Sequence, residues 1–440
     1  MGKYFGTDGI RGEANVRLNV DIALKVGQYL GSVNRGKKIV VGQDTRLSST
    51  MFASAIAAGA TSMGADVYML GICATPALAH LVKMDGFGAG VMISASHNPY
   101  RDNGLKCFAN TGMKIDAEME DQIEAFIDGE IELDYAPSDA VGRVFDYAEG
   151  LDHYLTHIES IVETPLTGLK IILDCANGSA VSSAKRAFED LGANVRVMHH
   201  DPDGYNINTD CGSTHPESLQ KELARLGYDM GFAFDGDADR CLAVDHEGNM
   251  VDGDAILYIL GKDLKRRNRL KKNTVVTTVM ANLGFVHAMK EADIELVSTD
   301  VGDKHVFASM IENDFSLGGE QSGHIILKDY VTTGDGVLTA LILAEIVALS
   351  GKSLKDLSSG FIRFPQILEN IHVANKVATM NHPEVLNAVD RISTALGDDG
   401  RILVRSSGTE ELVRVMVEAK SIDLCESHVS DMIGIVKTIG

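Results

Sequence analysis

Several features are absent from this 440-residue sequence, and each absence excludes a class of protein. The six cysteines include no C-x-x-C pair, which argues against a thiolate metal site and against a disulfide framework. No apolar run approaches the roughly 20 residues of a membrane-spanning helix, so we expect no membrane partner. The first eight residues lack the apolar region of a signal peptide. We therefore expect a cytoplasmic protein with reduced thiols.

Basic residues are also scarce, with 40 Lys and Arg against 62 Asp and Glu, a formal net charge of −22. This balance argues against a general nucleic-acid binder, and we expect no nucleic-acid partner. The one basic run, residues 265–272, is interpreted as the solvated end of a helix before the next strand. The length predicts roughly three domains, and the 45% apolar content is typical of a globular protein.

Three segments repeat one plan: an apolar strand, a polar turn, an amphipathic helix and a second strand. They are residues 38–70, 170–197 and 274–297. Each is a βαβ pattern, which predicts sheets that are at least partly parallel.

The C-terminal part of the chain follows a different pattern. A helix is expected at about 335–350 and a change of domain near 360–366. Strands are expected at 402–405 and 412–417, and a helical tail at about 424–437. This order predicts a small α+β domain.

One polar loop follows the apolar run 91–93 and reads S-A-S-H-N-P. Serines and Asn-Pro are common turn formers, so a plain turn is one interpretation. An acyl hydrolase is disfavoured because His97 directly follows Ser96 and the G-x-S-x-G pattern is missing. A phosphoryl carrier is the third interpretation, and it requires a metal and cationic groups elsewhere in the chain.

A second loop supplies a candidate metal site. Asp235, Asp237 and Asp239 alternate after an apolar strand, which directs their carboxylates to one side. Unit charges 4 Å apart repel by roughly 4 kcal/mol at an effective dielectric of about 20, so a cation is expected, and oxygen ligands suit Mg²⁺. An EF-hand fails because Arg240 and His246 replace the required Gly and Glu. A dehalogenase-type nucleophile loop fits poorly because of Asp239, and an acidic surface turn stays open.

A third loop, residues 318–324, reads G-G-E-Q-S-G-H. Glu320 and Ser322 alternate and could hydrogen-bond sugar hydroxyls, but a plain glycine turn explains the pattern equally well.

A fourth loop, residues 405–410, reads R-S-S-G-T-E. Ser407 and Glu410 match a helix capping box, but the strand character of 412–417 weakens that interpretation. Hydroxyls, backbone N–H groups and arginines favour a phosphate cradle instead. Because the chain is so acidic, an anionic substrate would bind only where basic residues make the electrostatic potential locally positive. The candidates are Arg405, Arg414, Arg240, Lys106 and Arg11.

Taken in order, the four loops resemble those of the α-D-phosphohexomutase superfamily over essentially the whole chain. Further stretches resemble its phosphoglucosamine mutase branch in particular: residues 5–12, 93–100, 102–106, 211–217 and 319–324. Two positions depart from the pattern. Glu411 stands where a proline is usual, and Cys107 stands where an aromatic residue is usual. Neither removes a group with a catalytic role.

The resemblance implies an α/β fold in which three similar mixed-sheet domains and a smaller C-terminal α+β domain surround one central cleft. The expected boundaries are 1–150, 151–252, 253–364 and 365–440, with one of the four loops in each domain.

The resemblance also implies a function, the interconversion of glucosamine 6-phosphate and glucosamine 1-phosphate for UDP-N-acetylglucosamine and cell-wall precursor synthesis. A phosphorylated Ser96 would exchange its phosphoryl group with the sugar through a bisphosphorylated sugar, which also serves as activator. One Mg²⁺ per site would be held by Asp235, Asp237, Asp239 and Ser96. His97, Lys106, Arg11 and Arg240 would assist the transfer. The implied substrate-binding residues are Glu320, Ser322, His324, Arg405, Ser407, Gly408, Thr409 and Arg414.

Other functions stay open at this stage. A phosphoglucomutase or phosphomannomutase would use the same mechanism on another sugar. A non-catalytic sugar-phosphate binder would use the same scaffold, and a metal-dependent phosphatase would release free phosphate. The expected partner is a small-molecule hexosamine phosphate, and the sequence is compatible with a homodimer without deciding the oligomeric state.

Overall fold

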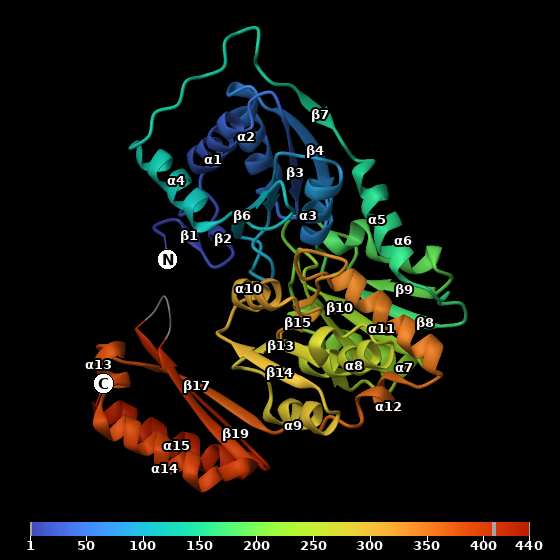
Figure 1. The fold of residues 1–440 in the computed structure, drawn as a ribbon, viewed down its shortest axis with the longest axis vertical. Helices are drawn as coiled ribbons and strands as arrows, with labels where there is room; N and C mark the ends of the chain where they lie inside the picture. Colours follow the sequence, from blue (N-terminus) through green and yellow to red (C-terminus); the bar gives the residue numbers. More distant parts are fainter. Residues whose placement is uncertain (1, 407–410, 440) are drawn as a thin grey trace. The chain divides into compact units, whose positions relative to one another are not determined.

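A computed structural model describes residues 2–406 and 411–439. The chain divides into two compact units. Unit 1 comprises residues 1–280 and 294–359, and unit 2 comprises residues 281–293 and 360–440. Figure 1 traces the chain with its helices and strands labelled. Each unit is described by itself.

The N-terminal part of unit 1 is a mixed sheet with the strand order β1-β2-β6-β5-β3-β4-β7. Its strands are β1 (Phe5–Gly6), β2 (Gly9–Glu13), β3 (Lys38–Gln43), β4 (Asp66–Ile72), β5 (Ala89–Ile93), β6 (Asp102–Ala109) and β7 (Val144–Asp146). Its helices are α1 (Val20–Val33), α2 (Ser49–Ser62), α3 (Thr75–Met84) and α4 (Ala117–Asp128). Asn19 and Asp116 cap the N-termini of α1 and α4 by accepting backbone N–H groups.

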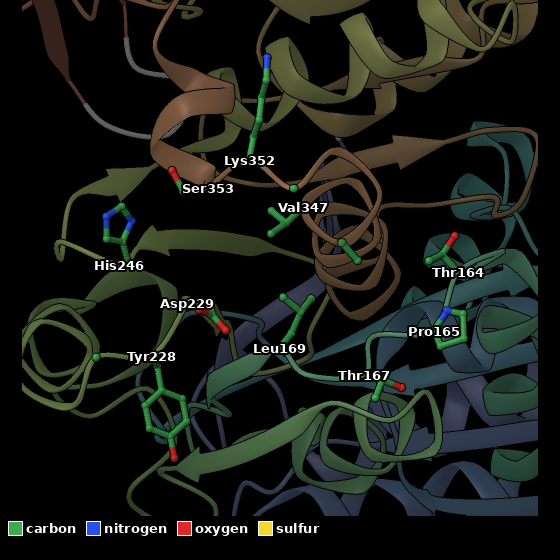
Figure 2. A pocket seen from close by; sticks show the side chains of 13 residues that line it. Thr164, Pro165, Thr167, Leu169, Tyr228, Asp229, His246, Val347, Lys352 and Ser353 are labelled. Carbon is green, nitrogen blue, oxygen red and sulfur yellow. The ribbon is translucent and has the colours of Figure 1, made fainter.

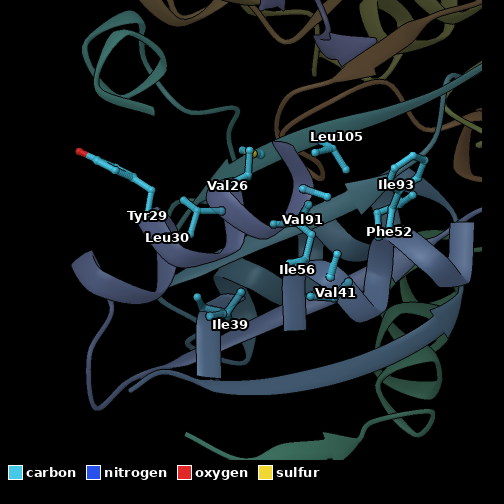
Figure 3. Packing of buried hydrophobic residues seen from close by; sticks show 14 of the residues in the cluster. Val26, Tyr29, Leu30, Ile39, Val41, Phe52, Ile56, Val91, Ile93 and Leu105 are labelled. Atoms are coloured by element: carbon cyan, nitrogen blue, oxygen red, sulfur yellow. The ribbon is translucent and has the colours of Figure 1, made fainter. Parts of the chain in front are cut away.

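Apolar side chains from both helices and sheet form the core of this part, as Figure 3 shows. They come from α1, α2 and the strands β3, β5 and β6, and include Val26, Leu30, Ile39, Val41, Phe52, Ile56, Val91, Ile93 and Leu105. Burying each large apolar side chain is worth roughly 1.5–3 kcal/mol. This core therefore fixes strands β5 and β6, which flank the loop that contains Ser96 and is called the serine loop below.

The second sheet of unit 1 has the order β12-β11-β10-β8-β9. Its strands are β8 (Lys170–Asp174), β9 (Asn194–Met198), β10 (Met230–Phe234), β11 (Cys241–Asp245) and β12 (Met250–Val251). The helices of this region are α5 (Gly150–Ile161), α6 (Ala184–Asp190) and α7 (Glu217–Leu226), with 3₁₀ turns at Ser179–Ser182 and Gly212–Thr214. β10 and β11 form an antiparallel pair, and the loop between them carries the three aspartates.

The third sheet of unit 1 has the order β14-β13-β15-β16. Its strands are β13 (Thr274–Thr278), β14 (Glu295–Thr299), β15 (Leu317–Gly319) and β16 (Ile325–Leu327). The helices are α8 (Gly253–Arg266), α10 (Asp303–Asn313), α11 (Gly336–Ser350) and α12 (Leu354–Ser358), and a 3₁₀ turn spans Lys271–Asn273. The antiparallel pair β15 and β16 encloses the third loop.

Unit 2 contains an antiparallel sheet of order β17-β19-β18. Its strands are β17 (Gln366–His372), β18 (Gly400–Ser406) and β19 (Leu412–Ala419). The helices are α9 (Leu283–Glu291), α13 (Lys376–Met380), α14 (Pro383–Leu396) and α15 (Ile422–Ile439), with a 3₁₀ turn at Gly397–Asp399. Residues of α14, α15 and the sheet share one apolar core.

The three βαβ patterns are confirmed, because β3 pairs with β4, β8 with β9 and β13 with β14 in parallel register. The C-terminal strands and the helical tail are confirmed as well, and so is the α/β fold class. All six cysteines lie in the described part of the chain, are buried and form no disulfide. Within the described ranges, no helix is both long and apolar enough to cross a membrane. The four domain boundaries stay a prediction.

A close contact between α1 and α2 generates a test of this packing. A methyl group at Gly27 would clash with the carbonyl oxygen of Ile56 in α2, whereas a methyl at Gly434 in α15 would meet open space. We expect Gly27→Ala to destabilise the protein by about 1–3 kcal/mol, since overpacked sites must shift backbone. We expect Gly434→Ala to be neutral or stabilising, because alanine is the better helix former. Thermal unfolding measures both, and an unchanged Tm for Gly27→Ala would contradict the packing.

Candidate active site

The serine loop connects β5 to β6 and presents Ser96 in an uncommon backbone conformation. Ser96 has φ +54°, a left-handed value that is rare for a residue with a side chain. It is 1% exposed, and its Oγ donates a hydrogen bond of 2.5 Å to Asp235 Oδ2. The loop therefore delivers one hydroxyl to the aspartate loop more than 130 residues downstream.

The aspartate loop lies between β10 and β11 and brings the three predicted carboxylates together. One oxygen from each of Asp235, Asp237 and Asp239 lies within 4.8 Å of the others, and all three residues are buried. A side chain at Gly236 would clash with the carbonyl oxygen of Ser96, so only glycine allows the two loops to approach this closely.

Burial and mutual repulsion dominate the electrostatics of the three carboxylates. Loss of hydration, followed by the charges of Asp239 and Asp237, raises the pKa of Asp235 to about 8. Burial opposes ionisation of Asp239 too, but the neighbouring Lys106 ammonium holds the pKa of Asp239 well below its usual range. Asp239 therefore favours the charged form because a cation is close, and Asp235 retains its proton near neutral pH.

Lys106 on β6 is the cation that the fold itself provides. Its Nζ lies 2.7 Å from Asp237 Oδ2, 3.2 Å from Asp239 Oδ2 and 2.9 Å from Asp8 Oδ2. Burial lowers the pKa of this amine, but the carboxylates of Asp237, Asp239 and Asp8 raise it well above its ordinary value. Lys106 is therefore an ammonium at neutral pH, and it neutralises only part of the acidic cluster.

The remaining polar atoms of the triad fit a divalent cation. Within the described part of the chain, Asp237 Oδ1 and Asp239 Oδ1 are buried and have no hydrogen-bond partner. Leaving a buried acceptor unsatisfied costs about 1–3 kcal/mol, and more for a charged group. Hard carboxylate oxygens at this spacing are the ligands that Mg²⁺ prefers. The donor set and its two orphaned oxygens therefore suit a magnesium-type ion.

Three further predicted residues are His97, which follows Ser96, and two arginines whose charges act on His97. His97 Nδ1 lies 3.4 Å from Ser96 Oγ, and burial, Arg240 and Arg11 lower the pKa of His97 to about 4. Arg240 follows the triad directly and donates its backbone N–H to Asp235 Oδ1. Arg11 on β2 pairs with Asp8. Among the described residues, the Nε atoms of Arg11 and Arg240 are buried without a hydrogen-bond partner, as expected of donors that await an anion.

The third predicted loop, residues 318–324, is called the sugar loop here and lies against the aspartate loop. A side chain at Gly323 would clash with the carbonyl oxygen of Cys241, which directly follows the loop 235–240. His324 accepts the N–H of Gly334 at Nε2, and its Nδ1 lies 3.6 Å from Asp239 Oδ1. Glu320 accepts the N–H of Gly302, and Ser322 is exposed. The structure thus brings three of the four predicted loops together within unit 1.

The fourth predicted loop belongs to unit 2. Arg405 on β18 and Arg414 on β19 are directly opposite each other in antiparallel register. Burial and the neighbouring Arg414 lower the pKa of Arg405, which marks a position where an anion would be stabilised. Ser407, Gly408 and Thr409 lie outside the described residues.

Several charged or polar residues of the site were missed in the sequence. Lys114 Nζ lies 2.5 Å from Asp8 Oδ1 and 2.6 Å from Asp303 Oδ2, and Thr75 Oγ1 donates to Asp237 Oδ2 at 2.5 Å. Only Asp8 carried a signal in the sequence, because it stands in residues 5–12, F-G-T-D-G-I-R-G, one of the stretches that carry the family resemblance. The others are single polar residues whose partners lie more than 100 positions away.

A second group with metal-ligand chemistry contains a carboxylate that is already hydrogen-bonded through both of its oxygens. Atoms of Asp174, His199 and Cys211 lie within 4.8 Å of one another. The two Asp174 oxygens accept the N–H groups of Ala176 and Gly212, and burial raises the pKa of the Cys211 thiol to about 12. We interpret this group as a polar tie between β8 and the following loops.

The large hollow in Figure 2, about 630 Å³ in volume, is separate from these residues. It is lined by segments 164–169, 227–229 and 347–353 together with His246. None of the predicted site residues that the structure describes borders this cavity, so the size of a cavity does not locate the site.

Fold and site together define a class: α/β proteins that set a buried serine against an aspartate triad in repeated domains. Four models of the phosphoglucomutase/phosphomannomutase family match in order. They describe α/β/α domain I at residues 2–134, domain II at 152–248, domain III at 252–364 and the C-terminal domain at 368–433. The chain belongs to the phosphoglucomutase/phosphomannomutase family, which confirms the predicted superfamily.

Individual members of the family show which proteins this chain is similar to over its full length. The chain is 48% identical to a phosphoglucosamine mutase of Lachnoclostridium phytofermentans, covering 100% of this chain and 99% of that relative. It is also 48% identical to one from Streptococcus pneumoniae, with 99% of each chain covered. A phosphoglucomutase/phosphomannomutase family protein from Burkholderia thailandensis has a similar structure, with TM-score 0.82 and 26% identity over 99% of this chain and 97% of that one. An N-acetylphosphoglucosamine mutase from Aspergillus fumigatus shares the fold, with TM-score 0.71 and 18% identity over 99% and 96%.

The raised pKa of Asp235 generates a test of the metal site. Below about pH 8 this carboxyl is protonated, and the proton must leave before Asp235 binds an ion. We therefore expect Mg²⁺ affinity to rise up to tenfold per pH unit below about pH 8 and to level off above it, with close to one proton released per ion on the acidic side. Calorimetric titration in buffers of different ionisation enthalpy counts that proton.

Asp237→Asn should abolish this binding, and Asp203→Asn, in an exposed turn, is the matched control. An affinity independent of pH between about 6 and 8 would contradict the assignment of the metal site.

Proposed function

We propose that the chain is a phosphohexomutase, an isomerase that acts as an intramolecular phosphotransferase on glucosamine 6-phosphate and glucosamine 1-phosphate. One observation carries the proposal: Ser96 Oγ lies 2.5 Å from Asp235 inside a buried triad that Lys106 neutralises only in part. The sugar is supported by the full-length relatives, which are named phosphoglucosamine mutases at 46–48% identity. Nothing in the comparisons favours glucose or mannose phosphates more strongly.

In the proposed reaction, Ser96 is the donor while it is phosphorylated and the acceptor once its hydroxyl is free. The P–O bond to Ser96 Oγ breaks and a P–O bond to the free sugar hydroxyl forms, while the hydroxyl proton passes to Ser96 Oγ. The resulting bisphosphorylated sugar reorients in the site. The same exchange in reverse then returns its other phosphoryl group to Ser96. A sugar bisphosphate added from solution would phosphorylate Ser96 and so serve as activator. Such transfers depend mainly on positioning and charge stabilisation.

The residues around Ser96 suit these two requirements. Arg11 and Arg240 offer buried donors to phosphoryl oxygens, and the Lys106 ammonium adds positive charge. His97, neutral near pH 7, can hydrogen-bond without adding charge. A Mg²⁺ held by Asp235, Asp237, Asp239 and Ser96 would neutralise charge on the transferring group.

Substrate binding is proposed for the other two loops. Glu320, Ser322 and His324 would hold sugar hydroxyls. The phosphate that does not react would be held by Arg405, Ser407, Gly408, Thr409 and Arg414. The division at 1–150, 151–252, 253–364 and 365–440 assigns one loop to each domain, and the four family-model ranges lie close to it.

Replacing Ser96 tests the proposed phosphoryl carrier. We expect Ser96→Ala to lower kcat by at least about a thousandfold, because the acceptor oxygen is gone. Intact-mass measurement should show wild type about 80 Da heavier than expected after incubation with glucose 1,6-bisphosphate, and no such increase in the variant. Ser54→Ala, an exposed serine in α2, should keep both mass increase and activity. A fully active Ser96→Ala protein would refute the mechanism.

A comparison of sugars tests the proposed substrate. Glucosamine 6-phosphate, glucose 6-phosphate and mannose 6-phosphate are assayed with the bisphosphate activator, and we expect the highest kcat/KM for glucosamine 6-phosphate. A higher kcat/KM for either other sugar would reassign the specificity. Release of free phosphate at the rate of substrate loss would identify a phosphatase, because a mutase must keep water from the phosphoserine.

A further inference from the structure

The conformation of Ser96 needs support from elsewhere in the chain. A left-handed conformation costs a residue with a side chain roughly 1–2 kcal/mol, and such outliers persist only where surrounding contacts determine them. The Ser96 N–H donates to Ser94 Oγ at 2.9 Å. The Ser96 carbonyl oxygen accepts from Arg46 Nη2 at 2.7 Å and from Asn208 Nδ2 at 2.9 Å.

Arg46 supplies the most extensive of these contacts. Besides Ser96, its Nη1 donates to the carbonyl oxygens of Pro99 at 2.5 Å and Asp102 at 3.0 Å. Its Nε donates to Asp44 Oδ2 at 2.7 Å, and the side chains of both residues are 0% exposed. One planar guanidinium thus fixes three carbonyl groups along the serine loop, a geometry that a lysine cannot reproduce.

Asp44 joins the two sides of the serine peptide. Its Oδ2 accepts from Ser94 Oγ at 2.7 Å as well as from Arg46, and its Oδ1 accepts from Ser49 Oγ at 2.7 Å. One branch of hydrogen bonds runs from Asp44 through Ser94 to the Ser96 N–H, and the other runs through Arg46 to the Ser96 carbonyl. We call Asp44, Arg46 and Ser94 the serine clamp.

A buried ion pair is an inefficient way to stabilise a fold. Removing both charges from water costs several kcal/mol per ion, and apolar residues of similar volume often give equal or greater stability. The contacts of the serine clamp converge instead on Ser96, whose hydroxyl donates to Asp235 of the triad. Its geometry therefore fits a requirement for alignment better than a requirement for stability.

We propose that the serine clamp positions Ser96 Oγ for phosphoryl transfer, with Arg46 as its main positioning residue. This inference rests on the proposed function and adds residues that contact Ser96 only through its backbone N–H and carbonyl groups. Arg46 acts through the backbone of Ser96. A displacement of about 1 Å in a reacting atom can cost about a hundredfold in rate, so loosening the loop should slow transfer in both directions.

The test compares Arg46→Lys with a matched arginine variant. Arg35 lies in the same sheet domain and also donates to backbone carbonyls, those of Met63 and Asp134. We expect Arg46→Lys to lower kcat by about 10–100-fold with KM changed by less than about threefold, because alignment is lost and binding groups are intact. Arg35→Lys should keep the wild-type kcat. Ser94→Ala removes the other branch and should lower kcat by about tenfold, which keeps the test possible if Arg46→Lys does not fold.

Further measurements separate positioning from stability. The rate at which glucose 1,6-bisphosphate phosphorylates Ser96, followed by intact mass, should fall in parallel with kcat, while Mg²⁺ affinity stays at the wild-type value. Assays are run well below the Tm of each variant. If Arg46→Lys and Ser94→Ala match Arg35→Lys in kcat while wild type is active and phosphorylated, the serine clamp is refuted alone. If wild type neither turns over nor becomes phosphorylated, the proposed function fails and this inference fails with it.

Discussion

The burial of three carboxylates in one loop is the constraint on which the rest of the site depends. Asp235, Asp237 and Asp239 are at most 5% exposed, and oxygens of all three lie within 4.8 Å. Unit charges 4 Å apart repel by roughly 4 kcal/mol at an effective dielectric of about 20. Lys106, the hydroxyls of Ser96 and Thr75, and the proton retained by Asp235 each reduce this cost. A divalent cation would balance the negative charge that these groups leave.

The close packing around the three carboxylates also explains why glycines stand where the loops contact one another. A side chain at Gly236 would strike the Ser96 carbonyl, one at Gly323 would strike the Cys241 carbonyl, and one at Gly336 would strike the Arg240 carbonyl. These contacts join the serine loop, the aspartate loop and the sugar loop through their backbones. Carboxylates pressed together need a rigid frame, because any loosening would let them separate and hydrate.

Regular structure and local motifs were predictable from the sequence, whereas the supporting charges were not. Alternation at 235–239 and strand periodicity are local signals, so the aspartate loop and the parallel pairs β3–β4, β8–β9 and β13–β14 were expected. Arg46 stands in a polar turn, and from the sequence alone a charged residue in such a turn is expected to be exposed to solvent. Its role emerges only because the fold brings β3 beside β5 and buries the turn. Lys114 and Asp303 pair over 189 positions, beyond any spacing rule.

The contrast between the two ion networks fits the reversible transfer proposed for Ser96. Lys106 contacts the carboxylates through single atoms, a form of contact that tolerates small shifts as charge moves. Arg46 instead holds carbonyl groups through a rigid fork, where a small shift breaks hydrogen bonds. An oxygen that serves as acceptor in one half-reaction and leaving atom in the other must keep one position throughout. Adaptable charge beside the aspartates and inflexible geometry around the serine would satisfy both demands.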